Sequence, residues 1–318
     1  MNRQTQSTAP RLGIVLSSGG VRGVFAHTGF LLAFDTTGFE VSAVSGCSAG
    51  AVVGGVFASG TPILQWANSI QNIQPGQFWR PRWLRLVWSL LVHQGKGCTG
   101  FSSSETARDF FQAQLKAKTF EECKYPFHAL AINVATGKKT IFSQGTLAPR
   151  IVASAAIPLL YQPVEIGGEF YSDGALLDLA PTDAICCQHN LDILIIHHVA
   201  QRTEGSASLA HAMKQPWTMI EILNRLLYRQ RPWYLSDKAV TVRRCPCGCG
   251  ALVIVLEPVL PPLNWPVTKK GVEVLQSARQ QAAAFFATYQ EILLGNEEIS
   301  KEDIDETDPL LTTSGCQT

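Results

Sequence analysis

Short apolar runs of strand length alternate along this chain with longer stretches of helical periodicity. The alternation is typical of a mostly parallel β-sheet with helices on both faces, because parallel strands need long crossover connections and are buried on both sides. The sequence therefore predicts an α/β fold with three layers, α/β/α. The expected strands are residues 12–16, 41–44, 127–134, 140–142, 191–197 and 252–256, and the expected helices are residues 24–34, 49–58, 103–116, 147–155, 206–229 and 269–294.

A glycine-rich loop joins the first expected strand to the first expected helix. Its residues are Gly19, Gly20, Val21, Arg22 and Gly23. Where a strand runs through glycines into a helix, several backbone N–H groups stay unpaired and point at one spot, where the helix dipole also favours negative charge. Such a spot suits the oxyanion of a tetrahedral intermediate in acyl transfer.

The second expected strand leads into a Gly-x-Ser-x-Gly pentapeptide, formed by Gly46, Cys47, Ser48, Ala49 and Gly50. Small flanking glycines let the chain turn sharply from strand to helix, which lifts the serine hydroxyl clear of the sheet. Ser48 is therefore the expected nucleophile. Because the two strands are expected to be adjacent and parallel, both motifs should lie at the same carboxyl edge of the sheet, where open α/β folds bind their ligands.

A third motif follows an expected β-hairpin. Residues 163–171 alternate around Gly167 and Gly168, a pattern that predicts two short strands and would deliver Ser172 and Asp173 to a loop. The next two residues, Gly174 and Ala175, complete an Asp-Gly-Ala triplet.

Together these motifs resemble the patatin-like acyl hydrolases. The glycine loop of that family reads roughly Gly-Gly-Gly-x-Arg-Gly and is similar to residues 18–23, the nucleophile motif matches residues 46–50, and the family's Asp-Gly-Gly or Asp-Gly-Ala triplet matches residues 173–175. The resemblance covers about residues 11–185. It implies that Asp173 takes the proton of Ser48 without an intervening histidine, that the glycine-loop amides stabilise the oxyanion, and that neither a metal nor an organic cofactor is required.

Three residues near these motifs need separate comment. Ser18 replaces the first glycine of the family loop, where a positive φ is harder for serine to adopt, and Asp178 stands where asparagine is common. Arg22 fits a loop-anchoring role better than a role in binding a lipid phosphate.

Two other classes of function remain open. A conventional serine triad of the α/β-hydrolase type could use Ser48, Asp173 and either His197 or His198. These residues occur along the chain in the order serine, aspartate, histidine, as in that fold. That fold usually has several strands before its nucleophile, whereas here only one strand and one helix precede the strand that leads into Ser48. The chain could also be a membrane-binding scaffold that has lost activity.

Composition limits the partners. A formal net charge of +1 over 318 residues gives no overall reason to expect nucleic-acid binding. Without a run of about twenty apolar residues, the chain is expected to be cytoplasmic or peripheral at membranes. The segment 79–92 combines arginines with tryptophans and fits a lipid interface and packing on the sheet equally well. If it meets a membrane, phospholipids or lysophospholipids become the expected substrates.

We expect one patatin-like domain at residues 11–294, between a flexible N-terminus at residues 1–10 and an acidic, disordered tail at residues 295–318. Nine cysteines without even spacing favour a reducing compartment. Residues 245–250 read Cys-Pro-Cys-Gly-Cys-Gly, which lacks the two-residue gap and the second cysteine pair typical of zinc sites. This run therefore favours a reactive or turn-forming loop over a metal site.

Overall fold

The computed structural model describes residues 9–77, 88, 92, 99–199, 232–263 and 267–305. Its strands are β1 Leu12–Leu16, β2 Val41–Cys47, β3 Gly100–Ser102, β4 Phe127–Asn133, β5 Lys139–Phe142, β6 Leu159–Tyr161, β7 Val164–Ile166, β8 Glu169–Asp173, β9 Ile193–His197, β10 Val240–Arg244 and β11 Leu252–Leu256. The α-helices are α1 Gly20–Phe34, α2 Ala49–Ala58, α3 Ile63–Gln71, α5 Glu105–Gln114, α6 Leu147–Ser154, α9 Val267–Thr288 and α10 Gln290–Leu293. The described residues also form short 3-10 helices, η1 Pro75–Gln77, η2 Gly174–Leu176 and η3 Lys301–Asp303.

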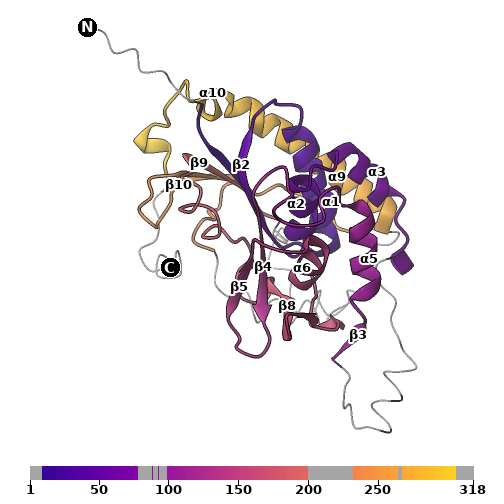
Figure 1. Ribbon diagram of the computed structural model, residues 1–318. Helices are drawn as coiled ribbons and strands as arrows, with labels where there is room; N and C mark the ends of the chain where they lie inside the picture. Colours follow the sequence, from indigo (N-terminus) through magenta and orange to yellow (C-terminus); the bar gives the residue numbers. More distant parts are fainter. Residues whose placement is uncertain are drawn as a thin grey trace.

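The described strands form one nine-stranded sheet and a separate pair, β3 and β6. The order in the large sheet is β10-β11-β9-β1-β2-β4-β8-β7, and β5 also pairs with β4. The central strands β11, β9, β1, β2 and β4 run parallel, whereas β10, β5, β8 and β7 add antiparallel pairs beside them. The predicted α/β fold with a mostly parallel central sheet is confirmed (Figure 1).

The central strands are buried on both faces, as the apolar strand β1 illustrates. Ile14 and Leu16 belong to the core cluster that includes residues of α1, α2, α3 and α9, while Val15, on the opposite face, packs in a second cluster with residues 180–191 and 233–235. Successive side chains of a strand point to opposite faces, so both layers contribute to burial. In Figure 1 the helices α1, α2, α3 and α9 lie together. Close packing of α1 on α9 requires Gly29, because a Cβ there would overlap the backbone of Leu275.

Some boundaries differ from the sequence expectations. Helix α1 begins at Gly20 rather than residue 24, so the glycine loop is partly helical, and β2 continues to Cys47. The hairpin of β7 and β8 is present, but Asp173 is the last residue of β8 instead of a loop residue, because β8 pairs with β4 as far as Ala131. The expected helix at residues 206–229 lies outside the described residues.

The acidic C-terminal segment is folded as far as Asp305. The Asp305 carboxylate accepts hydrogen bonds from the backbone N–H of Val242 and from Lys238, and Ile299 and Ile304 pack against the core. The expectation of a disordered tail from residue 295 is therefore wrong for this part, since two apolar side chains and the edge of β10 hold it. Residues 306–318 lie outside the described chain.

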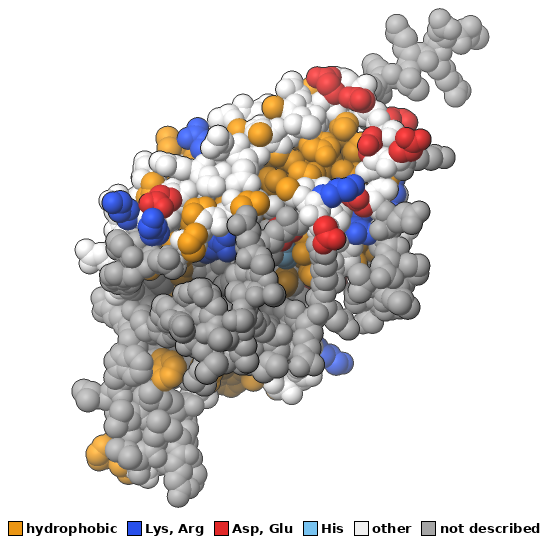
Figure 2. Space-filling view, turned by 180° about the vertical axis from the view of Figure 1, so that it is seen from behind, with side chains coloured by type: hydrophobic (Ala, Val, Ile, Leu, Met, Phe, Trp, Pro, Cys, Tyr) orange, Lys and Arg blue, Asp and Glu red, His pale blue; other side chains and the backbone are white. Residues whose placement is uncertain are grey.

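The described surface mixes charges of both signs. Figure 2 shows acidic and basic side chains in small groups on one face, around an area of apolar side chains. This distribution agrees with the net charge of +1. Among the helices of the described residues, none is both long and apolar enough to cross a bilayer.

Candidate active site

Strands β1 and β2 bring the glycine loop and the serine pentapeptide to one edge of the sheet, as expected from the sequence. Leu16 pairs with Gly46 in the parallel register, so both motifs start at neighbouring strand ends. The approach is close because Gly50 lacks a side chain: a Cβ there would overlap the carbonyl oxygen of Leu16. A larger residue at position 50 would therefore push α2 away from β1.

Ser48 occupies a strained turn between β2 and α2. Its φ is 53° and its ψ is −118°, a conformation that a non-glycine residue adopts only when its surroundings hold it. The Ser48 N–H donates to Ser154 Oγ at 3.1 Å, and this hydroxyl donates to the carbonyl oxygen of Leu130 at 2.5 Å. Ser154 thus ties the turn to α6 and β4, a contact that no sequence motif predicted.

The Ser48 side chain meets Asp173. Ser48 Oγ donates a hydrogen bond of 2.7 Å to Asp173 Oδ2, although the two residues are 125 positions apart. Asp173 Oδ1 accepts a second hydrogen bond from the Ala175 N–H at 2.9 Å, and the Cys47 thiol lies 3.9 Å away. Both side chains are buried, at 3% exposure each. The serine hydroxyl is therefore fixed against a carboxylate that water scarcely reaches.

Burial changes the acidity of Asp173. Loss of solvation raises the pKa of its carboxyl group to about 6, since a charge is less stable away from water. Hydrogen bonds from Ala175, Ser48 and Cys47 oppose that rise because they favour the charged form. Asp173 is thus a stronger base than an exposed aspartate and is still ionised at neutral pH.

The glycine loop lies beside the start of α2. A Cβ on Gly23 would lie 2.9 Å from the Cβ of Ala49, so the first turns of α1 and α2 are neighbours. The N–H groups of the first turn of a helix have no partner within the helix and carry partial positive charge. Gly20 has a φ of 56°, whereas Ser18 does not adopt a positive φ and donates its N–H to the carbonyl of Leu179. Serine at position 18 is therefore compatible with the loop.

Arg22 reaches away from the loop to the segment before α9. Its Nη2 donates to the carbonyl oxygen of Leu260 at 2.8 Å. Burial lowers the pKa of the guanidinium, and its buried Nε has no hydrogen-bond partner among the described residues. The contact with Leu260 fits the loop-anchoring role expected for this arginine.

The two histidines of the alternative triad lie apart from Ser48 and Asp173. His197 Nδ1 is 2.8 Å from His27 Nδ1, and His27 Nε2 is 2.7 Å from the carbonyl oxygen of Ser17. His198 Nδ1 is 3.2 Å from the Tyr234 hydroxyl. Within the described chain neither His197 nor His198 hydrogen-bonds to Ser48 or Asp173. Burial lowers the pKa of His27 to about 4 and that of His197 well below its usual value, so both rings are neutral.

Asp178 is part of a partly buried ion cluster. The Lys139 ammonium group lies 2.8 Å from Asp178 Oδ2 and 2.6 Å from Asp183 Oδ1. Asp178 Oδ1 also accepts the N–H of Ala180, which shapes the turn after η2. Lys139 compensates the extra negative charge that aspartate brings in place of asparagine.

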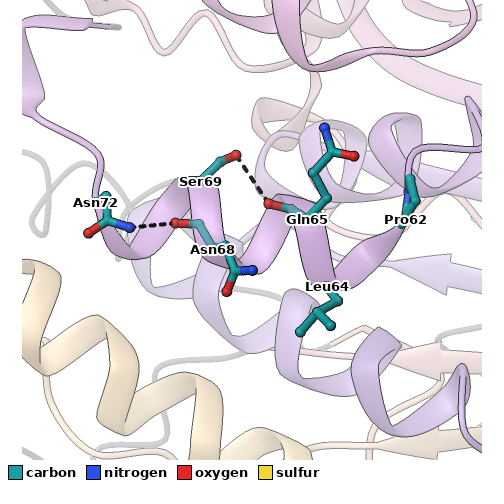
Figure 3. A pocket seen from close by; sticks show the side chains of 6 residues that line it. All are labelled: Pro62, Leu64, Gln65, Asn68, Ser69 and Asn72. Carbon is teal, nitrogen blue, oxygen red and sulfur yellow. Dashed lines mark hydrogen bonds between the residues drawn. The ribbon is translucent and has the colours of Figure 1, made fainter.

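A surface hollow beside α3 is chemically different from the edge that holds Ser48. Figure 3 shows its lining of Pro62, Leu64, Gln65, Asn68, Ser69 and Asn72. Ser69 Oγ and Asn72 Nδ2 donate to the carbonyl oxygens of Gln65 and Asn68, so these polar groups complete α3 itself. None of the lining residues is an acid or a base, and we assign no chemistry to this hollow.

The comparison with protein families agrees with this fold and these motifs. The family description "Patatin-like phospholipase" matches residues 14–185, which is more than half of the 318 residues. The chain belongs to the patatin-like phospholipase family, and this membership supports a lipid hydrolase.

The individual relatives share about a third or less of their aligned residues with this chain. An uncharacterized NTE family protein of Mycobacterium tuberculosis is 31% identical over 223 residues, which cover 70% of this chain and 57% of the relative. Lysophospholipase NTE1 of Cryptococcus neoformans is 27% identical over 191 residues, covering 58% of this chain and 11% of that protein. The match thus spans little more than half of the mycobacterial relative and a small part of the fungal one.

Two solved structures share the fold. VipD from Legionella pneumophila has a TM-score of 0.51 at 14% identity, over 88% of this chain and 67% of VipD. Human GIVD cytosolic phospholipase A2 has a TM-score of 0.50 at 11% identity, over 93% of this chain and 62% of the enzyme. At such low identities the similarity concerns the fold alone.

Proposed function

We propose that this protein hydrolyses ester bonds of phospholipids or lysophospholipids through an acyl intermediate on Ser48. The observation that carries the proposal is the buried 2.7 Å hydrogen bond from Ser48 Oγ to Asp173 Oδ2 at the edge of the sheet where the glycine loop begins. A nucleophile held against a base and next to unpaired main-chain donors is the arrangement that acyl transfer requires.

The reaction then proceeds in two halves. Asp173 accepts the proton of Ser48 Oγ while this oxygen attacks the ester carbonyl, and the N–H groups at the start of α1 stabilise the oxyanion. The protonated Asp173 next gives its proton to the departing alcohol, which leaves an acyl-Ser48 ester. In the second half a water molecule gives a proton to Asp173 and attacks this ester, and the fatty acid leaves as Ser48 regains its proton.

The raised pKa makes Asp173 a better base than an ordinary aspartate. An unperturbed aspartate with a pKa of about 3.9 accepts a hydroxyl proton poorly. With a pKa of about 6, Asp173 holds a proton more strongly and remains a carboxylate at neutral pH. The neutral, buried His27 and His197 are not needed for this step.

Two observations support lipids as the substrates. The fungal relative is named a lysophospholipase. Exposed apolar side chains also lie close in sequence to the site, with Val21 in the glycine loop 43% exposed and Leu177, four residues after Asp173, 49% exposed. Trp88 and Val92, four positions apart in the sequence, are 62% and 51% exposed. These side chains suit contact with acyl chains at a membrane surface.

A fluorophosphonate probe tests the proposal directly. We expect stoichiometric labelling of the wild type, because Ser48 Oγ attacks phosphorus and displaces fluoride, and no labelling of Ser48→Ala. Peptide mass spectrometry should place the adduct on Ser48, and Ser277→Ala on α9 serves as the matched control that keeps full labelling. Labelling that survives in Ser48→Ala would exclude Ser48 as the nucleophile, and a wild type that resists the probe would support the inactive scaffold.

The pH profile provides a second prediction. Because the deprotonated carboxylate is the active form, kcat/KM should rise with pH, with a midpoint near the Asp173 pKa of about 6, and stay level above it. Below the midpoint Asp173 is protonated and cannot accept the Ser48 proton. The measurement uses a soluble short-chain p-nitrophenyl ester, with circular dichroism over the same range to exclude unfolding. A flat profile between pH 5 and pH 8 would contradict the assignment of Asp173 as the base.

A further inference from the structure

Five cysteines from two distant segments come together at the edge of the sheet opposite to Ser48. Cys186 and Cys187 lie in the helical turns before β9, and Cys245, Cys247 and Cys249 lie in the loop from β10 to β11. Leu252 at the start of β11 pairs with Ile193, which in turn pairs with Leu12. The cluster thus lies at the amino ends of the parallel strands, whereas Ser48 follows a carboxyl end. It is independent of the proposed hydrolytic site.

The sulfur atoms lie close enough together to bind a single metal ion. Cys247 Sγ lies 2.8 Å from Cys187 Sγ, 3.1 Å from Cys245 Sγ and 3.9 Å from Cys186 Sγ. Cys186, Cys187 and Cys247 form one set, and Cys245, Cys247 and Cys249 another, with all ligand atoms of a set within 4.8 Å of one another. Sulfurs around tetrahedral Zn²⁺, with bonds of about 2.3 Å, are about 3.8 Å apart.

The loop of residues 245–251 is shaped to present alternate thiols. The Cys245 N–H donates to the Ala251 carbonyl at 2.9 Å, which closes the loop, and Gly248 and Gly250 adopt φ values of 78° and 80°. Within the loop, the backbone N–H of Cys247 hydrogen-bonds to the Cys245 sulfur and that of Ala251 to the Cys249 sulfur. Backbone donors aimed at sulfur stabilise thiolates, the form that binds metals.

Cys186, Cys245 and Cys247 contact one another, and Cys187 and Cys249 each contact two thiols of the cluster. Cys245 contacts Cys186, Cys247 and Cys249, and Cys247 also contacts Cys186 and Cys249. Cys186 and Cys245 are buried, while Cys249 is exposed and leaves a route from solvent. Cys187 is exposed as well, but it is the chain neighbour of Cys186, whereas the Cys249 sulfur accepts the N–H of Ala251 within the same loop as Cys245 and Cys247, so we take Cys249 as the fourth ligand.

We propose that Cys186, Cys245, Cys247 and Cys249 bind one thiophilic divalent ion of the Zn²⁺ class and thereby fasten the β10–β11 loop to the turns before β9. On binding, the four thiols release their protons to solvent and each sulfur forms one bond to the ion, with no change of oxidation state. The fold supplies the fourth thiol, Cys186, to the three of the run at residues 245–250. Because four protein ligands fill a tetrahedral ion, the site is structural and leaves no position for substrate.

Titration of the reduced, metal-free full-length protein with Co²⁺ tests this site. We expect about one equivalent to bind, with the sulfur-to-cobalt charge-transfer bands and intense visible bands of tetrahedral thiolate coordination, and Zn²⁺ to displace it. Zn²⁺ should also raise the melting temperature by several degrees, since the folded chain, which adds Cys186 to the site, binds it more tightly than the unfolded chain does. Cys245→Ser and Cys247→Ser should each weaken Co²⁺ binding by more than about 100-fold.

Two further variants make the assignment specific. Cys123→Ser changes a thiol that bonds to the Thr119 carbonyl outside the cluster and should leave metal binding intact, and so should Cys187→Ser. Loss of binding in Cys187→Ser with retention in Cys249→Ser would overturn the ligand set. Absence of thiolate bands, or a disulfide between Cys187 and Cys247 that forms in spite of excess Zn²⁺, would overturn the metal site itself.

Discussion

Ser48→Ala and Asp173→Asn should each lower the rate of ester hydrolysis by at least about 10³-fold, and the double variant should be no slower than the slower single variant. The reason is that the two side chains act as one unit: Ser48 Oγ supplies the attacking oxygen and Asp173 Oδ2, 2.7 Å away, takes its proton. Once either is missing, the other has nothing to act on. Steady-state hydrolysis of lysophospholipid vesicles and of a soluble ester measures all three variants.

The histidines give this experiment its control. His197→Ala and His198→Ala should stay within about tenfold of the wild-type rate, because a base that touches neither Ser48 nor Asp173 contributes little to proton transfer. Thermal melts of these variants separate any loss of fold from a loss of chemistry, since His197 packs against Phe30 in the core. A histidine variant as inactive as Asp173→Asn would favour the serine triad over the proposed pair.

The sheet and its nearest helices could be predicted well because their signals are local. Strands β1 and β11 and helix α2 have the bounds that the sequence indicates. Each is a short apolar run, and turn-forming residues mark some of its ends, such as the Ser-Ser-Gly-Gly run after β1 and the strained Ser48 before α2. Elements that depend on distant partners were missed: β3 and β6 have three residues each and form a sheet only with one another.

In the candidate site, too, the local motifs could be predicted and the contacts between distant elements could not. The motifs indicated that Ser48, Asp173 and the glycine loop belong together, and the fold brings Ser48 and Asp173 into contact. The support from Ser154, which accepts the Ser48 N–H, depends on α6 packing against α2 and β4 and has no signature in the sequence. The cysteine cluster is a similar case, since the contact between Cys186 and Cys247 joins residues 61 positions apart. Local sequence patterns do not predict contacts of this kind between elements that are distant along the chain.

Asp173→Asn should also stabilise the folded protein above about pH 6. Burial raises the pKa of Asp173 from 3.8 to about 6, so the folded state binds this proton more tightly than the unfolded state does. As the pH rises through this interval the unfolded chain releases the proton first, and stability is lost until the pH passes about 6. At neutral pH this difference in proton binding lowers the free energy of unfolding of the wild type by about 3 kcal/mol. Asparagine cannot ionise, and it can still accept from Ala175 and bond to Ser48.

The stabilisation by Asp173→Asn should therefore increase as the pH rises. Melting temperatures of Asp173→Asn should exceed those of the wild type by several degrees at pH 8, and the difference should shrink at pH 5 and vanish near pH 4, where the wild-type carboxyl is protonated too. Asp305→Asn is the matched control with the opposite sign, because hydrogen bonds from Lys238 and Val242 lower the pKa of Asp305. It should destabilise the protein at pH 8 and lose this effect as the pH falls. An Asp173→Asn gain of equal size at pH 5 and pH 8 would show that ionisation of this carboxylate does not oppose folding, and the proposed base would lose its physical basis.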